Sequence, residues 1–200
     1  MTDPAEIRAV LCEPYRHGSH SPFAGITCDR PLDLSGLTLS GVDFSGARFA
    51  QGLDARGARF DGLSWFIGAE FGGDARFDGA VFSSDARFED ARFSGAARFG
   101  EAEFRGIARF DRARFANGFE AAKVTCNGNC SLEAAQVAGA ASLAQSEFMG
   151  GLWCHDAALP ATTDLDGTQV HGRLWLRGAR RGNVPLRPGD IEMAFGYTYA

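Results

Sequence analysis

The sequence predicts an all-β solenoid, because three features recur together along most of the chain. Phenylalanine returns at steps of five and six residues, which gives an eleven-residue period. A small residue usually stands two positions before each phenylalanine, with Arg, Glu, Asp or Gln between them. This alternation is typical of a short, half-buried strand, and the Gly, Ser and Asp residues that follow favour a corner. Each unit therefore forms one side of a coil.

The composition agrees with a repeat protein of one domain. The 200 residues include 26 glycines and 17 phenylalanines, and Lys123 is the only lysine among 20 basic residues. The formal net charge of −5 argues against direct binding to nucleic acid or to an anionic membrane surface, since both need clustered Lys and Arg. No apolar run is long enough to span a bilayer, and the N-terminus lacks the pattern of a secretory signal. We expect a cytoplasmic protein.

Residues 1–31 are predicted to form an N-terminal cap made of a short helix and a loop. Asp3 is suited to the N-cap position, with proline and glutamate at the first and third helical positions. The helix is expected to run from Asp3 to about Cys12, and residues 13–31 to form a loop. Three apolar residues of the helix would cover the first coil: Ile7, Val10 and Leu11.

Residues 32–178 are predicted to form the repeat itself. Thirteen of the phenylalanines lie between residues 44 and 115, and the same steps continue through small or apolar residues as far as Leu176. The next central position is Arg181, which a core would not accept unpaired, so the repeat is expected to end near residue 178. Two roles remain open for residues 179–200, a C-terminal cap or a segment through which the chain forms a homodimer.

The first repeat units identify a family. Three units have a five-residue spacing: Leu32-Asp33-Leu34-Ser35-Gly36, Leu37-Thr38-Leu39-Ser40-Gly41 and Val42-Asp43-Phe44-Ser45-Gly46. Together with the units from Ala47-Arg48-Phe49 onward, they resemble the pentapeptide-repeat family, whose consensus is Ala-(Asp/Asn)-Leu/Phe-x-x, in an eleven-residue variant. The resemblance implies a right-handed quadrilateral parallel β-helix with large side chains stacked inside.

Four sides per coil give 22 residues per turn, and we call them sides A to D in chain order from Phe49. On side B the central residue shrinks to Ala55 and Ala121, while the residue two positions earlier grows to Leu53 and Phe119, which keeps the core volume roughly constant. About six to seven coils are expected. The core stack comprises Phe49, Phe71, Phe93 and Phe115 on side A, Phe77 and Phe99 on side B, Phe60, Phe82 and Phe104 on side C, and Phe66, Phe88 and Phe110 on side D.

No set of residues in the sequence suggests catalysis, so we expect no enzyme activity, no cofactor and no metal site. The nearest approach to a metal site is formed by Cys126, Cys130 and Cys154 with His155. The three cysteines fall on inward positions, which predicts buried thiols, and His155 falls on an outward one. Burial is also expected for the other two cysteines, Cys12 and Cys28.

The remaining polar residues favour a solvated surface. The other histidines show no spacing typical of a catalytic triad or a metal pair: His17, His20 and His171. Asp and Glu lie in outward columns that alternate with Arg, which indicates surface ion pairs.

All three tryptophans fall in one outward column of side D: Trp65, Trp153 and Trp175. Trp153 and Trp175 are expected to be neighbours on adjacent coils. Exposed indoles are typical anchors of protein interfaces, so this column is the candidate surface for a protein partner or a second copy of the chain. The alternative is that the C-terminal tail folds back over the two indoles.

These features favour a non-enzymatic scaffold whose rigid surface mediates protein–protein interaction. The resemblance implies an alternative, because some relatives, including quinolone-resistance and gyrase-inhibitor self-resistance proteins, are dimeric acidic rods. Those relatives mimic duplex DNA, bind DNA gyrase and protect it from inhibitors or modulate them. Duplex DNA carries one negative charge per ~1.7 Å, whereas no side of the predicted coil has a strong acidic excess.

Overall fold

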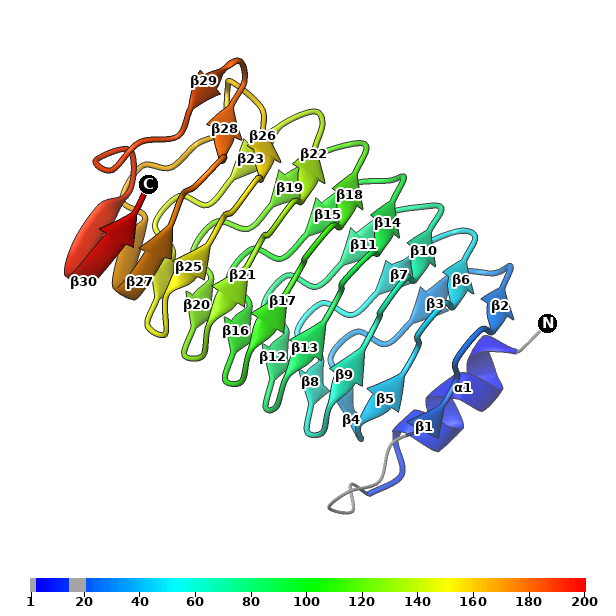
Figure 1. Ribbon diagram of the computed structural model, residues 1–200. Coiled ribbons are helices and arrows are strands. Elements are labelled where there is room, and N and C mark those ends of the chain that lie inside the picture. Colours follow the sequence, from blue (N-terminus) through cyan, green and yellow to red (C-terminus); the bar gives the residue numbers. More distant parts are fainter. Residues whose placement is uncertain (1–2, 15–20) are drawn as a thin grey trace.

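The chain winds into a parallel β-solenoid of about eight turns, with one short helix at its N-terminal end (Figure 1). A computed structural model describes residues 3–14 and 21–200. Figure 1 shows short strands stacked into ladders along one axis. This arrangement confirms the predicted parallel β-helix and exceeds the expected six to seven coils.

Helix α1 (Pro4–Leu11) covers the first coil. Asp3 is its N-cap and accepts a hydrogen bond from the backbone N–H of Ala5 at 2.9 Å. Ile7 and Leu11 lie four residues apart on one face of the helix and are fully buried in the core. Val10 is turned away from that face and is 38% exposed, so the prediction that Val10 helps to cover the coil is wrong.

The four sides consist almost entirely of two-residue strands. Side A is β2 (Thr27–Cys28), β6 (Arg48–Phe49), β10 (Glu70–Phe71), β14 (Arg92–Phe93), β18 (Arg114–Phe115), β22 (Gln136–Val137), β26 (Ala158–Leu159) and β28 (Arg180–Arg181), followed by β29 (Val184–Pro185). Side B is β3 (Leu32–Asp33), β7 (Leu53–Asp54), β11 (Ala75–Arg76), β15 (Ala97–Arg98), β19 (Phe119–Glu120) and β23 (Ala141–Ser142).

Sides C and D have the same construction but meet in one long strand. Side C is β4 (Thr38–Leu39), β8 (Arg59–Phe60), β12 (Val81–Phe82), β16 (Glu103–Phe104), β20 (Thr125–Cys126) and β24 (Glu147–Phe148). Side D is β1 (Ser21–Pro22), β5 (Val42–Asp43), β9 (Ser64–Trp65), β13 (Ala86–Arg87), β17 (Ala108–Arg109), β21 (Cys130–Ser131) and β25 (Leu152–Trp153). Strand β27 (Gln169–Trp175) pairs with both β24 and β25 and joins the two sides.

The register follows the spacing of the repeat. From Leu34 to Ala55 the central positions are separated by three steps of five residues and one of six, and Leu32 pairs with Leu53. In the later coils, where steps of five and six residues alternate between central positions, Phe71 pairs with Phe93. The offset is therefore 21 residues at the start and 22 afterwards, because each six-residue unit adds one residue to the turn.

The repeat starts earlier than predicted. Strands β1 and β2 pair with β5 and β6, so strands of the first coil occupy part of the segment 13–31 that was expected to be a loop. The ring of Phe23 stacks on that of Phe44 at a centroid distance of 5.7 Å, and Cys28 is fully buried. This coil does not follow the pattern in the sequence, because Pro22 stands at the polar position before Phe23, and Ile26 and Thr27 precede Cys28.

The twelve phenylalanines assigned to the core stack are all buried, none of them more than 2% exposed. Rings one coil apart are nearly parallel, as in Phe71 and Phe93, whose centroids are 4.7 Å apart at 2°. Rings on neighbouring sides meet edge to face, as in Phe77 and Phe88 at 5.5 Å and 79°. Both arrangements suit the quadrupole of the ring. Side chains therefore fill the interior along this part of the coil.

The repeat also ends later than predicted. Leu159 pairs with Arg181, so the side A ladder continues through β28, past residue 178. Arg181 occupies the next central register, but its side chain is only half-buried, and its Nε has no hydrogen-bond partner within the described chain. Strand β29 then turns back antiparallel to β28, which ends the ladder.

The last strand, β30 (Glu192–Tyr199), covers the end of sides C and D. It pairs in parallel with β27, from Gln169 opposite Glu192 to Trp175 opposite Tyr199. In the segment that precedes β30, the side chains of Leu186 and Ile191 are buried in the core. The other edge of β30 pairs with no strand of the described chain. The segment thus covers the last coil and leaves a free strand edge.

Candidate interaction surface

Side D turns two tryptophans outward on adjacent coils. The residues on either side of each indole are buried: Leu152 and Cys154 around Trp153, and Leu174 and Leu176 around Trp175. Because Trp153 and Trp175 pair in register, their ring centroids lie 6.2 Å apart at 62°. Both side chains are half-buried. The alternation of the strands and the 22-residue turn together produce this pair.

Strand β30 extends the column with a further aromatic residue. Tyr199 lies against Trp175 at a centroid distance of 5.3 Å, and Tyr197 lies 5.3 Å from Tyr199. The tail thus stands beside the tryptophans and leaves Tyr197 and Tyr199 49% and 47% exposed. We call Trp153, Trp175, Tyr197 and Tyr199 the aromatic patch.

The aromatic patch lacks hydrogen-bond acceptors for its indoles. Trp153 Nε1 and Trp175 Nε1 are both buried and have no partner within the part of the chain that the structure describes. A buried donor without a partner costs about 1–3 kcal/mol. His155 lies 6.2 Å from Trp175 between ring centroids, but its Nε2 is directed to the carboxylate of Asp156 at 3.2 Å. Two N–H donors in the patch are therefore unsatisfied.

Trp65 lies in the same column but is not brought to the aromatic patch. The column runs Trp65, Arg87, Arg109, Ser131, Trp153, Trp175 and Tyr199. Its middle is polar, because Arg87 pairs with the buried Glu89 at 2.8 Å and the hydroxyl of Ser131 donates to the buried Asp111. The structure thus brings together two of the three tryptophans and joins them with two tyrosines.

Two arginines beside the patch were missed in the sequence. Arg173, Trp175 and Arg177 are alternate, outward residues, since the two leucines between them are buried. Both arginines are exposed. Arg173 Nε donates to the hydroxyl of Tyr197 at 2.9 Å, and its guanidinium carbon lies 5.9 Å from the centre of that ring. The alternation Arg-Leu-Trp-Leu-Arg is the signal that could have identified this row.

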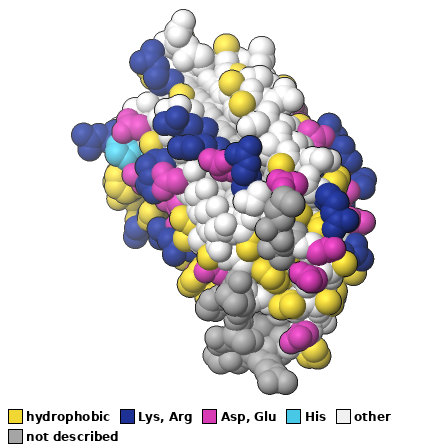
Figure 2. Space-filling model, turned by 90° about the vertical axis from the view of Figure 1, so that its right-hand side faces the viewer, with side chains coloured by type: hydrophobic (Ala, Val, Ile, Leu, Met, Phe, Trp, Pro, Cys, Tyr) yellow, Lys and Arg dark blue, Asp and Glu magenta, His cyan; other side chains and the backbone are white. Residues whose placement is uncertain are grey.

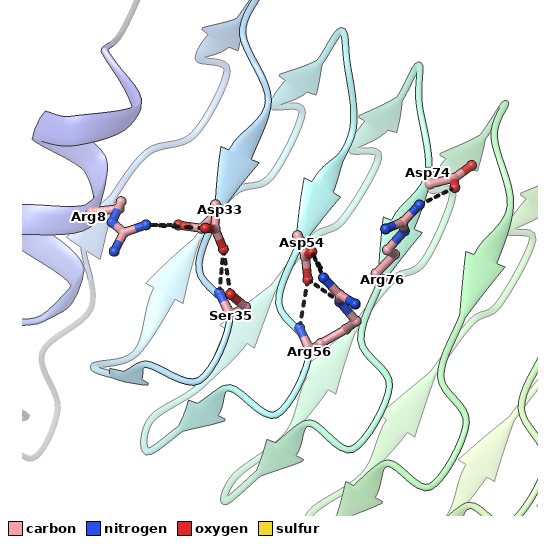
Figure 3. A network of polar contacts seen from close by, with 7 residues as sticks. All are labelled: Arg8, Asp33, Ser35, Asp54, Arg56, Asp74 and Arg76. Carbon is pink, nitrogen blue, oxygen red and sulfur yellow. Dashed lines mark hydrogen bonds and ion pairs between the residues drawn. The ribbon is translucent and has the colours of Figure 1, made fainter.

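Side B carries a second group of charged side chains, which pair with one another (Figure 3). Asp54 pairs with Arg56 at 2.6 Å, and Asp74 with Arg76 at 3.1 Å. These guanidinium hydrogen bonds lower the pKa of both carboxyl groups. The hydroxyl of Ser35 lowers the pKa of Asp33 in the same way. Each carboxylate is thus satisfied, and the group is a set of surface ion pairs.

The described residues, 3–14 and 21–200, contain no group of three or more His, Cys, Asp and Glu side chains that could hold a metal ion. His17 and His20 lie outside these ranges. His155 and His171 are half-buried and lie on different coils.

Four of the five cysteines are buried thiols: Cys28, Cys126, Cys130 and Cys154. Burial raises the pKa of Cys28 and Cys154, and a hydrogen bond with Cys126, together with burial, raises that of Cys130. Thiols of this kind are poor nucleophiles at neutral pH. Cys12 is exposed, so the prediction that it is buried is wrong. It caps the C-terminus of α1, past the helix face that packs on the coil.

The repeat matches a known family. A family model described as pentapeptide repeats (9 copies) matches residues 23–70, 58–103 and 88–136, which together span more than half of the chain. No curated protein and no solved structure matches the chain. In the part of the chain that the structure describes, α1 is the one helix, and it is too short to cross a membrane.

Proposed function

The chain belongs to the pentapeptide-repeat family, and we propose that it is a non-enzymatic scaffold whose surface binds another protein. The aromatic patch carries this proposal. Two of its members, Tyr197 and Tyr199, are among the seven large hydrophobic residues that are exposed in the described chain. Clustered exposed aromatics are typical of protein interfaces, because binding removes their apolar surface from water.

The core supports this proposal by holding the surface rigid. Trp153 and Trp175 stand on strands whose inward residues are part of the continuous buried core. A surface that is already in its binding conformation loses little conformational entropy on association. The fold therefore suits a docking surface more than a site that must close around a substrate.

The proposal is tested by replacing both tryptophans of the patch, with a control variant that replaces two paired outward residues on another side of the coil. The variant Trp153→Ser/Trp175→Ser should keep the native circular dichroism spectrum but lose bound protein. The control is Arg76→Ser/Arg98→Ser, which changes two paired outward positions on adjacent coils of side B. Association is measured by sedimentation equilibrium for the homodimer, and by mass spectrometry of proteins retained from a lysate for another partner. If all three proteins give the same mass and retain the same proteins, the patch is not an interaction surface.

DNA mimicry receives less support from the surface charges. Glu70 lies between Arg48 and Arg92, at 2.9 and 3.2 Å, and Asp90 pairs with Arg112 at 2.8 Å. Figure 2, which views the N-terminal end, shows Lys or Arg side chains close to Asp or Glu on both flanks. Arginines in the same columns thus offset the acidic side chains. A mimic of duplex DNA needs closely spaced, unpaired negative charge.

A gyrase supercoiling assay tests this alternative directly. We expect no inhibition of supercoiling and no protection from a fluoroquinolone at protein concentrations up to about ten micromolar, a range that would detect a moderate affinity. Inhibition at submicromolar protein would make the DNA mimic the leading function.

A further inference from the structure

Basic and acidic residues are segregated along the C-terminal third of the chain. Residues 124–172 contain five acidic residues and no Lys or Arg, whereas residues 167–189 contain five arginines and no Asp or Glu. The arginines are Arg173, Arg177, Arg180, Arg181 and Arg187. Because each turn of the solenoid takes 22 residues, this run places positive charge on the last coils, in a chain whose net charge is −5.

Among these residues, the outward row of Arg173, Trp175 and Arg177 contains several hydrogen-bond donors without a partner in the described chain. The guanidinium of Arg177 forms no hydrogen bond or ion pair with any residue that the structure describes, and that of Arg173 uses only its Nε, toward Tyr197. The indole N–H groups of Trp153 and Trp175 also lack acceptors. Two guanidinium groups with unused donors therefore lie beside the two indoles, whose own N–H groups are buried. A carboxylate is the group in proteins that satisfies such donors best, because it accepts several charge-assisted hydrogen bonds.

We propose that the aromatic patch with Arg173 and Arg177 is a docking site for an acidic segment of a partner protein. Carboxylates of the segment pair with the two guanidinium groups, and its neighbouring apolar side chains pack on Trp153, Trp175 and Tyr199. This inference rests on the proposed function and assigns the chemistry of the partner.

Charge complementarity selects this occupant over two others. A second copy of the chain in a two-fold contact would bring the patch against itself and place arginines opposite arginines. Duplex nucleic acid would extend from the patch past the preceding coils, where residues 124–172 hold five acidic residues and no Lys or Arg. A short acidic peptide segment can contact the two arginines without crossing those coils, and the one acidic side chain of this set beside Arg177 is that of Asp156, which pairs with His155.

The test uses a decaglutamate peptide labelled with fluorescein, and the full chain carrying Trp65→Phe. This background leaves Trp153 and Trp175 as the only tryptophans, so their emission reports binding at the patch. We expect a saturable rise in peptide anisotropy below about 100 micromolar protein, with a parallel change in indole emission. Binding should be lost on raising NaCl from about 50 to about 500 mM, since salt screens exposed charges.

Two double variants locate the site. Arg173→Gln/Arg177→Gln should weaken peptide binding about tenfold or more, because both charge-assisted contacts are removed. Arg98→Gln/Arg114→Gln removes the same charge from two exposed arginines on sides B and A, and should change the dissociation constant less than about twofold. Circular dichroism checks that both variants are folded.

The outcomes separate the inference from the function on which it rests. The inference is wrong if decaglutamate does not bind, if both double variants weaken it equally, or if a ten-base-pair DNA duplex binds more tightly than the peptide. If decaglutamate fails while the Trp153→Ser/Trp175→Ser variant still loses a protein partner, the interaction surface stands and only its preference for acidic segments is rejected. If that variant loses no partner either, the proposed function fails as well.

Discussion

At the scale of single residues, one corner in every eleven residues has a left-handed backbone, whether or not glycine occupies it. Glycine takes this position near both ends of the solenoid, for example at Gly79 and Gly167. Between them it is taken by seven other residues, with φ from 53° to 59°: Asp90, Glu101, Arg112, Lys123, Ala134, Gln145 and Asp156. This conformation costs a residue with a Cβ about 1–2 kcal/mol. The ladders on either side of the corner must compensate for that cost.

We therefore expect Ala134→Gly to stabilise the protein by about 0.5–1 kcal/mol, because glycine adopts φ of 53° without the Cβ strain. The measurement is urea unfolding followed by circular dichroism. The control is Ala144→Gly, one residue before the left-handed Gln145, where φ is not positive. At that position glycine only raises the conformational entropy of the unfolded chain, so the free energy of unfolding is expected to fall by about 0.5–1 kcal/mol. Equal effects of the two substitutions would contradict this account.

Thiol reactivity gives a second prediction at this scale. In the native protein, Ellman's reagent should react rapidly with one thiol of five, that of Cys12, because the other four are buried. Adding denaturant should expose the remaining four, including the buried Cys126 and Cys130 pair. Rapid reaction of two or more thiols without denaturant would show that the core opens or is packed differently.

At the scale of the elements, strands of two residues are stable only because each lies between two neighbours in a ladder. Close approach of consecutive coils depends on glycine at particular corners. A Cβ on Gly128 would lie 2.5 Å from the carbonyl oxygen of Gly106 in the preceding coil, closer than such atoms can come. At Gly79, by contrast, nothing lies within 4 Å of the added Cβ, although φ is +63°.

Gly128→Ala should therefore destabilise the protein by more than about 2 kcal/mol, since two backbones must separate. Gly79→Ala should cost only about 1 kcal/mol, the strain of a left-handed alanine. Urea unfolding of both variants compares the two costs. A Gly128→Ala protein as stable as the Gly79→Ala protein would mean that the coils are less tightly stacked than described.

The phenylalanine ladder gives a further prediction at this scale. Phe93→Asp should abolish folding, because it places an unpaired carboxylate between Phe71 and Phe115, which stack on either side of Phe93. Arg92→Ala, one residue away, should change stability by less than about 1 kcal/mol, since its ion pair with Glu70 is exposed. Circular dichroism tests both. A native spectrum for Phe93→Asp would refute the register of the core.

At the scale of the whole molecule, ion pairs within and between coils make stability depend on pH. The pKa values of Asp54 and Asp90 are lowered by hydrogen bonds from Arg56 and Arg112, and that of Glu103 by Arg105. A carboxyl group whose pKa is lower in the folded state stabilises it fully above the unfolded pKa. That contribution is lost as the pH falls through the folded value.

We therefore expect the urea midpoint to be steady from about pH 7 to about pH 5 and to fall below about pH 4, where these carboxyl groups gain protons. The urea midpoint should fall less in the Asp54→Asn variant, because it lacks one of these carboxyl groups. Each pair is largely exposed, so the effect is a sum of small contributions. A midpoint that stays constant or rises down to pH 3 would contradict the assignment.

Much of the fold could be predicted because the position of a residue within its repeat unit indicates whether its side chain belongs to the core. Small, polar and large residues alternate from Ala47 to Leu176, so the inward and outward positions follow without knowledge of contacts. The pairing of Trp153 with Trp175 follows from the same period, because they are 22 residues apart. Both ends were placed wrongly, since a proline stands at the polar position before Phe23, and Arg181 takes a central position that is elsewhere small or apolar.

The sequence alone determined the period, the core and the outward tryptophan column, because in a ladder each depends on spacing along the chain. Only the tertiary structure decided how the last strand lies on the final coil. Tyr199 pairs with Trp175 at an offset of 24 residues, after a register shift between Val170 and His171, so the period does not predict it. That pairing depends on the packing of a unique tail, and it places Tyr197 and Tyr199 beside Arg173 and Trp175.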